Sequence, residues 1–385
     1  MKVLFCVPAQ DQEGLLKAKL AGLHLWERLY HHAKKAGMHP VFVIRKESAL
    51  TRAIPPDSVA TNFNDLPCKS TERVVVSDPS FLPTVGCLKR LSQTSVSEAE
   101  FMDLGGCVLF LPSKGCFELE RLFGAEGFQR LKDFLSTFLR PVRARCEKGE
   151  LLPVGTEKER KKTQKLLFKA LIKETEGFMS RYVERPISLF ISKRLAETSI
   201  TPNQITVIST IIGLVGAFFI SLGQGFWQVA GALLFLAHSI IDGCDGEIAR
   251  IKFMESKLGG VLDFWGDNLV HAAVFWAIGL EWAMRTGSTY PLYLGVAAVF
   301  GTLLSASIVY FSTMTKAKEG PLYTSVSDSS KKGRVVKIAD FLSRRDFIYL
   351  VVILAFFNHL DWFLVAASIG SLIFAGVLLW IRLRG

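Results

Sequence analysis

The sequence predicts a two-domain protein, in which a soluble α/β domain precedes an all-α domain of six membrane-spanning helices. Residues 1–200 are mixed in character and rich in charge, whereas long apolar runs dominate residues 203–385. The mean hydropathy of +0.31 therefore averages two different kinds of segment. A chain of 385 residues is long enough to form both domains.

The first domain is expected to span residues 1–145. Its strands are predicted at the short apolar runs Val3–Val7, Val41–Ile44, Val74–Val76 and Cys107–Leu111. Helical patterns lie between or after these runs, at Leu15–Ala36 and Phe128–Leu139. Strands that alternate with helices indicate a largely parallel sheet.

A connector is expected over residues 146–200. Its charged stretch from Glu157 to Lys173 is predicted to be helical, and an amphipathic helix is predicted from Arg185 to Lys193. The apolar side of the second helix fits the membrane interface, and it fits equally well a linker helix packed on the soluble domain. The sequence leaves both readings open.

The third segment, residues 201–385, is the predicted transmembrane domain. Its apolar stretches are long enough for six spans, near 204–222, 226–246, 259–283, 290–314, 346–358 and 360–381. Lysines and arginines gather in alternate connections, at 247–258, at 315–345 and after the last span, whereas the opposite connections carry only Arg285. The positive-inside rule then predicts a multi-pass protein of the cytoplasmic (inner) membrane, with the N-terminal domain in the cytosol.

The net charge of +11 fits a membrane surface better than a nucleic acid. Basic runs from Lys158 to Lys173 and from Lys316 to Arg345 flank apolar segments, where they attract anionic lipid headgroups. No nucleic-acid motif accompanies them, so nucleic-acid binding is not expected. The seven cysteines form no CxxC pair, which indicates reduced thiols and argues against a disulfide framework or a zinc site.

Four aspartates carry the strongest chemical signal. Asp242 and Asp245 are three residues apart, and Asp263 and Asp267 are four apart, so each pair shares one helix face. A polar turn within residues 246–262 would return the chain, and the four carboxylates are then expected to converge at the cytosolic ends of the second and third spans.

Converging carboxylates near a membrane need a compensating cation. Ligands that are all oxygen select hard ions, which predicts Mg²⁺ or Mn²⁺, in a paired arrangement of two ions suited to phosphoryl transfer. Small residues at Gly243, Gly246, Ala249 and Gly259 let the helices approach closely and leave room for a base or a pyrophosphate.

From Asp242 to Asp267 the sequence reads D-x2-D-G-x2-A-R-x8-G-x3-D-x3-D. In this spacing it resembles the CDP-alcohol phosphatidyltransferase (CDP-alcohol phosphotransferase) family at every defined position. The stretch Thr201–Thr206 is similar to the start of that family's first span. The stretch Gly177–Arg185 is similar to the juxtamembrane segment of its inositol-phosphate branch.

The resemblance implies a six-helix membrane fold, a homodimer and a reaction that releases CMP. An acceptor hydroxyl would attack the β-phosphate of a CDP-linked donor, either CDP-diacylglycerol or a soluble CDP-alcohol. Asp242, Asp245 and Asp263 would hold the metal ions, and Asp267 would hold metal or act as general base. The CDP site would be formed by Asn203, Gly246, Ala249, Arg250 and Gly259.

The first domain resembles sugar-phosphate nucleotidyltransferases over Lys19–Gly37. The segment after its first strand, Pro8–Gly14, holds one glycine where that family has a glycine-rich phosphate loop. The metal-binding aspartate expected after Leu111 is replaced by Pro112 and Ser113. These departures favour a degenerate domain without catalytic activity.

Several assignments stay open at this level. The acceptor is expected to be inositol phosphate, with a bifunctional cytidylyltransferase and di-inositol-phosphate-phosphate synthase as the alternative. A transporter or a pseudoenzyme scaffold is the non-enzymatic alternative. Arg344 and Arg345 would bind an acceptor phosphate or anchor the chain at the membrane surface. His238 lies one turn before Asp242 and either contacts the site or packs as an ordinary helix residue, whereas His31 and His32 are adjacent and make a poor metal pair.

Overall fold

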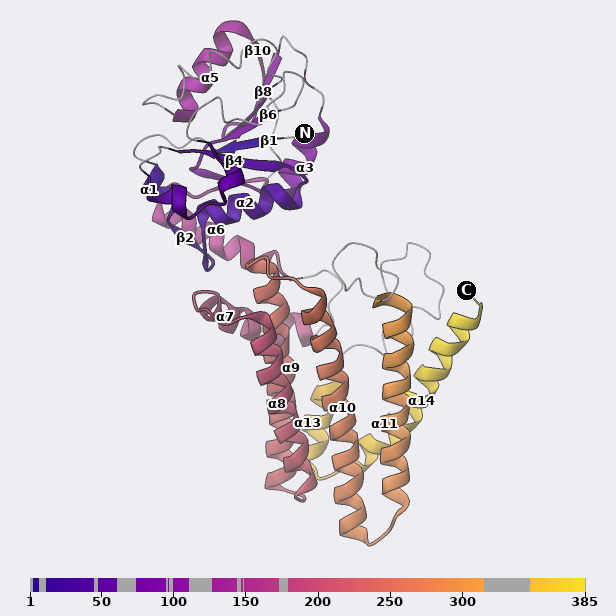
Figure 1. The fold of residues 1–385 in the computed structure, drawn as a ribbon. Coiled ribbons are helices and arrows are strands. Elements are labelled where there is room, and N and C mark those ends of the chain that lie inside the picture. Colours follow the sequence, from indigo (N-terminus) through magenta and orange to yellow (C-terminus); the bar gives the residue numbers. More distant parts are fainter. Residues whose placement is uncertain are drawn as a thin grey trace. The chain divides into compact units, whose positions relative to one another are not determined.

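The structure is a computed structural model that describes residues 3–6, 12–44, 48–60, 74–94, 96, 100–110, 127–143, 147, 149–172, 179–314 and 347–384. The chain divides into two compact units, Met1–Lys169 and Ala170–Gly385 (Figure 1). The predicted three-part division at residues 145 and 200 stays a prediction.

The first unit is built on a sheet in which the described strands follow the order β10-β8-β9-β6-β1-β4-β5. These strands are β1 (Val3–Cys6), β4 (His39–Val43), β5 (Val59–Ala60), β6 (Val74–Ser77), β8 (Glu100–Asp103), β9 (Cys107–Phe110) and β10 (Arg140–Arg143). The central strand β1 pairs in parallel with β4 and β6, whereas β9 is antiparallel to β6 and β8. The α/β prediction is confirmed, and the described sheet is largely parallel as predicted, with β9 as its antiparallel strand.

Helices and two small ribbons complete the first unit. The helices are α1 (Glu13–Leu16), α2 (Leu25–Lys35), α3 (Val85–Gln93), α5 (Gly127–Phe138), α6 (Glu157–Lys169) and the 3₁₀ turns η1 (Ala49–Arg52) and η2 (Pro56–Ser58). The ribbons pair β2 (Lys19–Leu20) with β3 (Leu23–His24), and β7 (Phe81–Pro83) with β11 (Leu151–Pro153).

The predicted helix over residues 15–36 is wrong in its first half. The ribbon β2–β3 occupies residues 19–24, and α2 begins only at Leu25. Ala21 and Gly22 both have positive φ, at 50° and 83°, which is the requirement of a two-residue hairpin turn. The buried guanidinium of Arg28 donates to the Leu20 carbonyl at 2.8 Å and to the Ala21 carbonyl at 3.2 Å, so α2 stabilises the turn.

His31 and His32 have the separate environments that helix geometry predicts. His32 is buried, and its Nδ1 lies 2.7 Å from the Pro83 carbonyl oxygen of β7. Burial lowers the pKa of His32 to about 4, so the ring is neutral at physiological pH. This histidine is part of the core and joins α2 to β7.

The order of the strands bears on where a metal-binding aspartate would lie in the first domain. Because β9 runs antiparallel to β6, its end lies away from the carboxyl edge of the parallel strands. The carboxylate that follows a parallel strand beside β1 is Asp78, directly after β6. Pro112 and Ser113, one of the two departures on which the prediction of a degenerate domain rests, lie outside the described residues. The absence of catalytic activity in this domain therefore stays a prediction.

The second unit is helical in its described part. Its elements are the π turn η4 (Ser180–Glu184), α7 (Arg185–Leu195), α8 (Pro202–Ser221), α9 (Phe226–Ile251), α10 (Lys257–Thr286), α11 (Tyr290–Val309), the π turn η5 (Tyr310–Met314), α13 (Phe347–Phe356) and α14 (Leu360–Arg384). The amphipathic helix α7 belongs to this unit and packs on α9, where Ser188 and Ser192 are buried. Its placement in the membrane interface stays a prediction.

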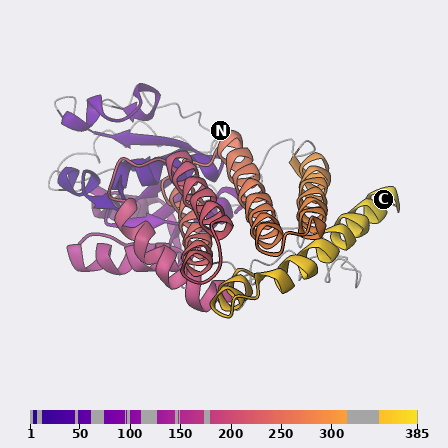
Figure 2. The same cartoon turned by 90° about the horizontal axis from the view of Figure 1, so that it is seen from below.

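Among the described helices, α8, α9, α11 (continued to Ser312) and α14 are long and apolar enough to cross a membrane. This supports an integral membrane protein. α10 carries more charge and α13 is short, so their assignment as the third and fifth spans stays a prediction. Figure 2 shows α14 running obliquely past α10 and α11, on which it packs.

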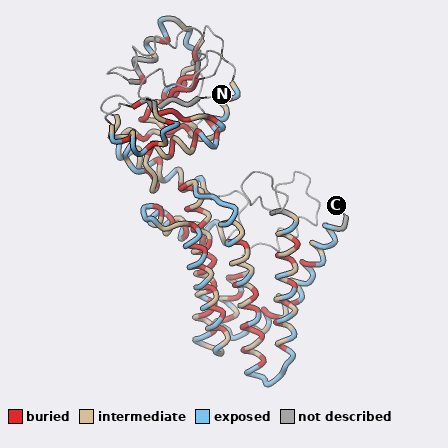
Figure 3. The backbone as a smooth tube through the Cα atoms, viewed as in Figure 1, coloured by how far each residue is buried: buried red, intermediate tan, exposed pale blue. Residues whose placement is uncertain are grey.

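Small residues set the closest contacts between these helices. A Cβ added to Gly231 of α9 would lie 2.5 Å from the Gly216 carbonyl oxygen of α8, so the two backbones touch. Apolar side chains of the helices fill the shared core, among them Phe235, Val274 and Leu364. Figure 3 shows buried residues recurring along each of these helices, with exposed residues between them. Close backbone packing of this kind fixes helix positions tightly in an apolar environment.

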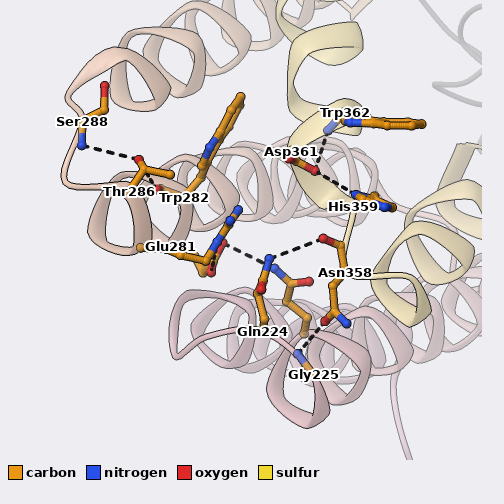
Figure 4. Close-up of polar contacts among 12 residues, drawn as sticks. Gln224, Gly225, Glu281, Trp282, Thr286, Ser288, Asn358, His359, Asp361 and Trp362 are labelled. Carbon is orange, nitrogen blue, oxygen red and sulfur yellow. Dashed lines mark hydrogen bonds and ion pairs between the residues drawn. The ribbon is translucent and has the colours of Figure 1, made fainter.

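Polar contacts join two connections, and also α9 to α10, at one end of the helices (Figure 4). The Asn358 side-chain oxygen accepts a hydrogen bond from Gly225 N at 2.7 Å, which links the α13–α14 turn to the α8–α9 turn. The buried Glu281 of α10 accepts from Arg285 at 3.1 Å and from Gln228 of α9 at 3.4 Å. Asn358 has a φ of 58°, a conformation that asparagine tolerates better than most residues.

Asn358→Ala is expected to destabilise the purified protein by about 2 kcal/mol, because it loses one hydrogen bond and forces alanine into the left-handed region. Asn358→Gly loses the same bond without the backbone strain and should cost about half as much. Thermal unfolding in detergent measures both. An alanine variant that unfolds like the wild type would contradict this role for Asn358.

Candidate active site

The aspartate motif lies on two helices joined by a tight turn. Asp242 and Asp245 are on α9, and Asp263 and Asp267 are on α10. α9 ends at Ile251, and Phe253 turns the chain with a φ of 57°. The Ser256 side chain then caps α10 by accepting from Gly259 N at 3.0 Å. The turn therefore returns the chain, as the spacing predicted.

Three of the carboxylates converge. One oxygen from each of Asp242, Asp245 and Asp263 lies within 4.8 Å of the other two. Asp242 and Asp245 are buried, and Asp263 is half-buried. All three line a cavity of about 300 Å³. A buried, all-oxygen donor set fits a hard divalent cation such as Mg²⁺ or Mn²⁺.

Two hydroxyl groups of α8 orient the carboxylates of α9. Thr206 Oγ1 donates to Asp245 Oδ2 in a short hydrogen bond, and Ser209 Oγ lies 3.4 Å from Asp242 Oδ1. The sequence analysis missed both residues. Their signal was a polar pair three residues apart within an apolar helix, which places two hydroxyls on one face.

The fourth aspartate lines the same cavity beside His238. His238 is buried, and its Nε2 lies 3.4 Å from Asp267 Oδ1. Its Nδ1 lies 2.9 Å from the Ser209 carbonyl oxygen, which fixes the ring between α8 and α10. Of the two readings left open for His238, the structure favours contact with the site.

The residues expected at the CDP site fall into two places. Gly246 and Arg250 line the cavity, and a Cβ on Gly246 would lie 3.1 Å from Arg250 Nη1. Asn203 and Gly259 lie close together, because a Cβ on Gly259 would be 2.9 Å from Asn203 Oδ1. Neither is among the described residues that line the cavity. Ala249 is half-buried and is not among the described lining residues.

Arg344 and Arg345, the expected acceptor-phosphate residues, lie outside the described residues. A cationic side chain that the sequence analysis did not select is found in the cavity instead. Arg185, at the start of α7, lines the cavity and pairs with Glu247 of α9, with Nη1 and Oε1 2.7 Å apart. No local sequence pattern predicts this pair, whose members are 62 residues apart.

Comparison with known proteins identifies this half of the chain. The family model for CDP-alcohol phosphatidyltransferase matches residues 199–383. A bifunctional IPC transferase and DIPP synthase of Thermococcus kodakarensis is 40% identical over 120 residues, which are 30% of this chain and 26% of that protein. An archaetidylinositol phosphate synthase of Pyrococcus horikoshii is 27% identical over 180 residues, which are 46% of this chain and 89% of that protein.

The matched part of the chain is limited to less than half of the bifunctional relatives, from 26% to 44% of their length in four organisms. Among solved structures, phosphatidylinositol phosphate synthase of Mycobacterium tuberculosis with CDP-DAG bound matches with a TM-score of 0.36 and 19% identity. That match covers 50% of this chain and 92% of that one. Residues 199–383 of this chain, which hold the four spaced aspartates, therefore match the CDP-alcohol phosphatidyltransferase family model.

Proposed function

We propose that this protein is a membrane enzyme that transfers a phospho-alcohol group from a CDP-linked donor to an alcohol acceptor, with release of CMP. The observation that carries the proposal is the convergence of Asp242, Asp245 and Asp263 within a domain of this family. A transporter or an inactive scaffold would not need three converging carboxylates, two of which lie against hydroxyl groups of α8.

Asp242, Asp245 and Asp263 would hold the divalent ions, Mg²⁺ or Mn²⁺. Asp267 lines the same cavity beside them. When bound, such ions neutralise the donor pyrophosphate and favour displacement at phosphorus. Thr206 and Ser209 hold the carboxylates in place for this role. Two ions would suit the number of carboxylates in the cavity.

Asp267 is the proposed general base. The acceptor oxygen attacks the β-phosphorus of the donor, its proton passes to the Asp267 carboxylate, and the bond from the β-phosphorus to the oxygen of CMP breaks. The His238 ring lies against the Asp267 carboxylate and limits its movement. Binding of the cytidine diphosphate group is assigned to Asn203, Gly246, Ala249, Arg250 and Gly259.

The acceptor is proposed to be inositol phosphate, because synthases named for inositol phosphate products are among the relatives that match this domain. CDP-diacylglycerol and a soluble CDP-alcohol both remain possible donors. The relatives named as bifunctional, together with the α/β unit before the membrane helices, favour a second candidate, in which residues 1–145 supply a CDP-alcohol. We further propose a homodimer in the cytoplasmic membrane, with the active site in the cytosol.

Asp263→Asn should lower CMP release by at least about 100-fold while the protein stays folded, since the amide keeps the shape of the side chain but loses the charge that binds metal. Asp361→Asn, at the start of α14 and outside the cavity, is the matched control and should keep full activity. The assay measures CMP from CDP-diacylglycerol or CDP-inositol with a panel of acceptors. Near-normal release by Asp263→Asn would refute the assignment of the site.

The orientation is tested by a pair of cysteines in a cysteine-free background. Glu255 and Ser288 are both exposed and lie at opposite ends of α10. Because positive charge gathers near Glu255, an impermeant maleimide added to intact cells should label Ser288→Cys and spare Glu255→Cys until the cells are permeabilised. The reverse pattern would place the aspartates on the outer side of the membrane.

A further inference from the structure

The cavity has a second wall, formed by the segment that precedes the first membrane helix. Ser180, Glu184, Arg185 and Ser188 line it on the side of η4 and α7. η4 is a single π turn, a deviation that is frequent at functional sites. Glu184 in this turn is held from α13, because Tyr349 donates to its Oε1 at 3.4 Å. The juxtamembrane segment is therefore part of the site and not only a linker.

Arg185 is fixed in this wall by a buried carboxylate. Glu247 has no exposed side-chain surface, whereas the Arg185 side chain is 17% exposed. Glu247 Oε1 accepts from Arg185 Nη1 at 2.7 Å and from Ser188 Oγ at 2.7 Å. A buried carboxylate needs such partners, so Glu247 holds the guanidinium strongly. A guanidinium carries five N–H donors in a planar fork.

Helix geometry places Arg185 over one face of α9. Gly243 and Glu247 are four residues apart on α9 and share the face that meets α7. A Cβ on Gly243 would lie 3.6 Å from Arg185 Nη1, so the guanidinium lies directly over this glycine. Asp242 adjoins Gly243 in sequence, and Asp245 lies two residues from both Gly243 and Glu247, so the aspartates lie on another side of α9. The cation and the aspartates thus border one cavity from two faces of α9.

The charge of the cavity makes this cation significant. A phosphate monoester carries about −1.5 to −2 charges at neutral pH, and the aspartates repel it unless a cation intervenes. Among the described residues that line the cavity, Arg185 and Arg250 are the cationic ones. Arg250 lies beside Gly246, on the side assigned to the cytidine diphosphate group. Arg185 is the other cation and lies beside Gly243.

We propose that Arg185, held by Glu247 and Ser188, binds the phosphate monoester of the acceptor and so selects phosphorylated alcohols over free ones. The planar guanidinium suits this task, because it can donate two parallel hydrogen bonds to a phosphate. The inference rests on the proposed transfer reaction. It adds a subsite, its ligand chemistry and the residue that positions the binding group.

The test compares variants of the full-length protein in detergent, with initial rates of CMP release as donor and acceptor are varied. Arg185→Gln should raise KM for inositol phosphate about 10- to 100-fold and change KM for the CDP donor less than about twofold. It should also reduce the preference for inositol phosphate over inositol. The inhibition constant of inorganic phosphate, competing with the acceptor, should rise in parallel.

Matched variants separate binding from structure. Arg181→Gln lies in the same segment, is exposed and does not line the cavity, so both KM values should stay at the wild-type level. Arg185→Lys keeps the positive charge beside Glu247 but loses the planar pair of N–H donors. It should raise the acceptor KM and keep the melting temperature of the wild type. If Arg185→Gln does not fold, the acceptor KM of Arg185→Lys tests whether Arg185 binds the phosphate. Glu247→Gln keeps the contact with Ser188 and should raise the acceptor KM less than Arg185→Gln.

Two results would overturn the proposal and leave the transfer reaction standing. One is a rise of the donor KM equal to that of the acceptor, which would place Arg185 at the donor pyrophosphate. The other is unchanged KM and unchanged phosphate inhibition in folded Arg185→Gln and Arg185→Lys, which would make the ion pair a structural contact only. Absence of CMP release by the wild type with every donor and acceptor would overturn the proposed function, and this inference with it.

Discussion

The membrane unit depends on one electrostatic constraint, the close approach of three carboxylates at the ends of apolar helices. At 4.8 Å, two carboxylate charges repel by about 3.5 kcal/mol when the effective dielectric constant is about 20. A hydrogen bond to a charged group contributes about 1.5 to 3 kcal/mol, so the hydroxyls of Thr206 and Ser209 do not offset the repulsion of three such pairs. A bound divalent cation reverses the sign of the interaction. The geometry therefore fits a metal site.

Helix packing maintains this geometry. α8, α9 and α10 approach one another through residues without side chains: Gly216 meets Gly231, a Cβ on Gly213 would lie 2.5 Å from Val270, and one on Gly266 would lie 2.7 Å from Thr210 Oγ1. Larger residues at these positions would separate the helices and move the carboxylates apart. These glycines set the distance between the helices and so the position of the aspartates. The glycines of the motif, Gly243, Gly246 and Gly259, lie against side chains.

Much of this site was predictable from sequence, since the four aspartates occur at helical spacing on either side of a turn. The remaining contacts were not, for physical reasons. Arg185 and Glu247 meet only because α7 folds back on α9, and no local pattern indicates such a pairing. The ribbon at residues 19–24 replaced a predicted helix because Arg28 and the turn at Ala21 outweigh helical periodicity. Asp78 was overlooked because the sheet order, which places β6 beside β1, cannot be read from separate strands.

The central claim is that these carboxylates bind divalent metal directly. Titration of the purified full-length protein with Mn²⁺, followed by electron paramagnetic resonance, measures this without relying on turnover. The account predicts saturable binding of about two ions in the wild type, in keeping with paired metals at phosphoryl-transfer sites. It predicts loss of that binding when Asp242 and Asp245 are both changed to Asn in a protein that remains folded. Equal binding by the wild type and this double variant would contradict the claim.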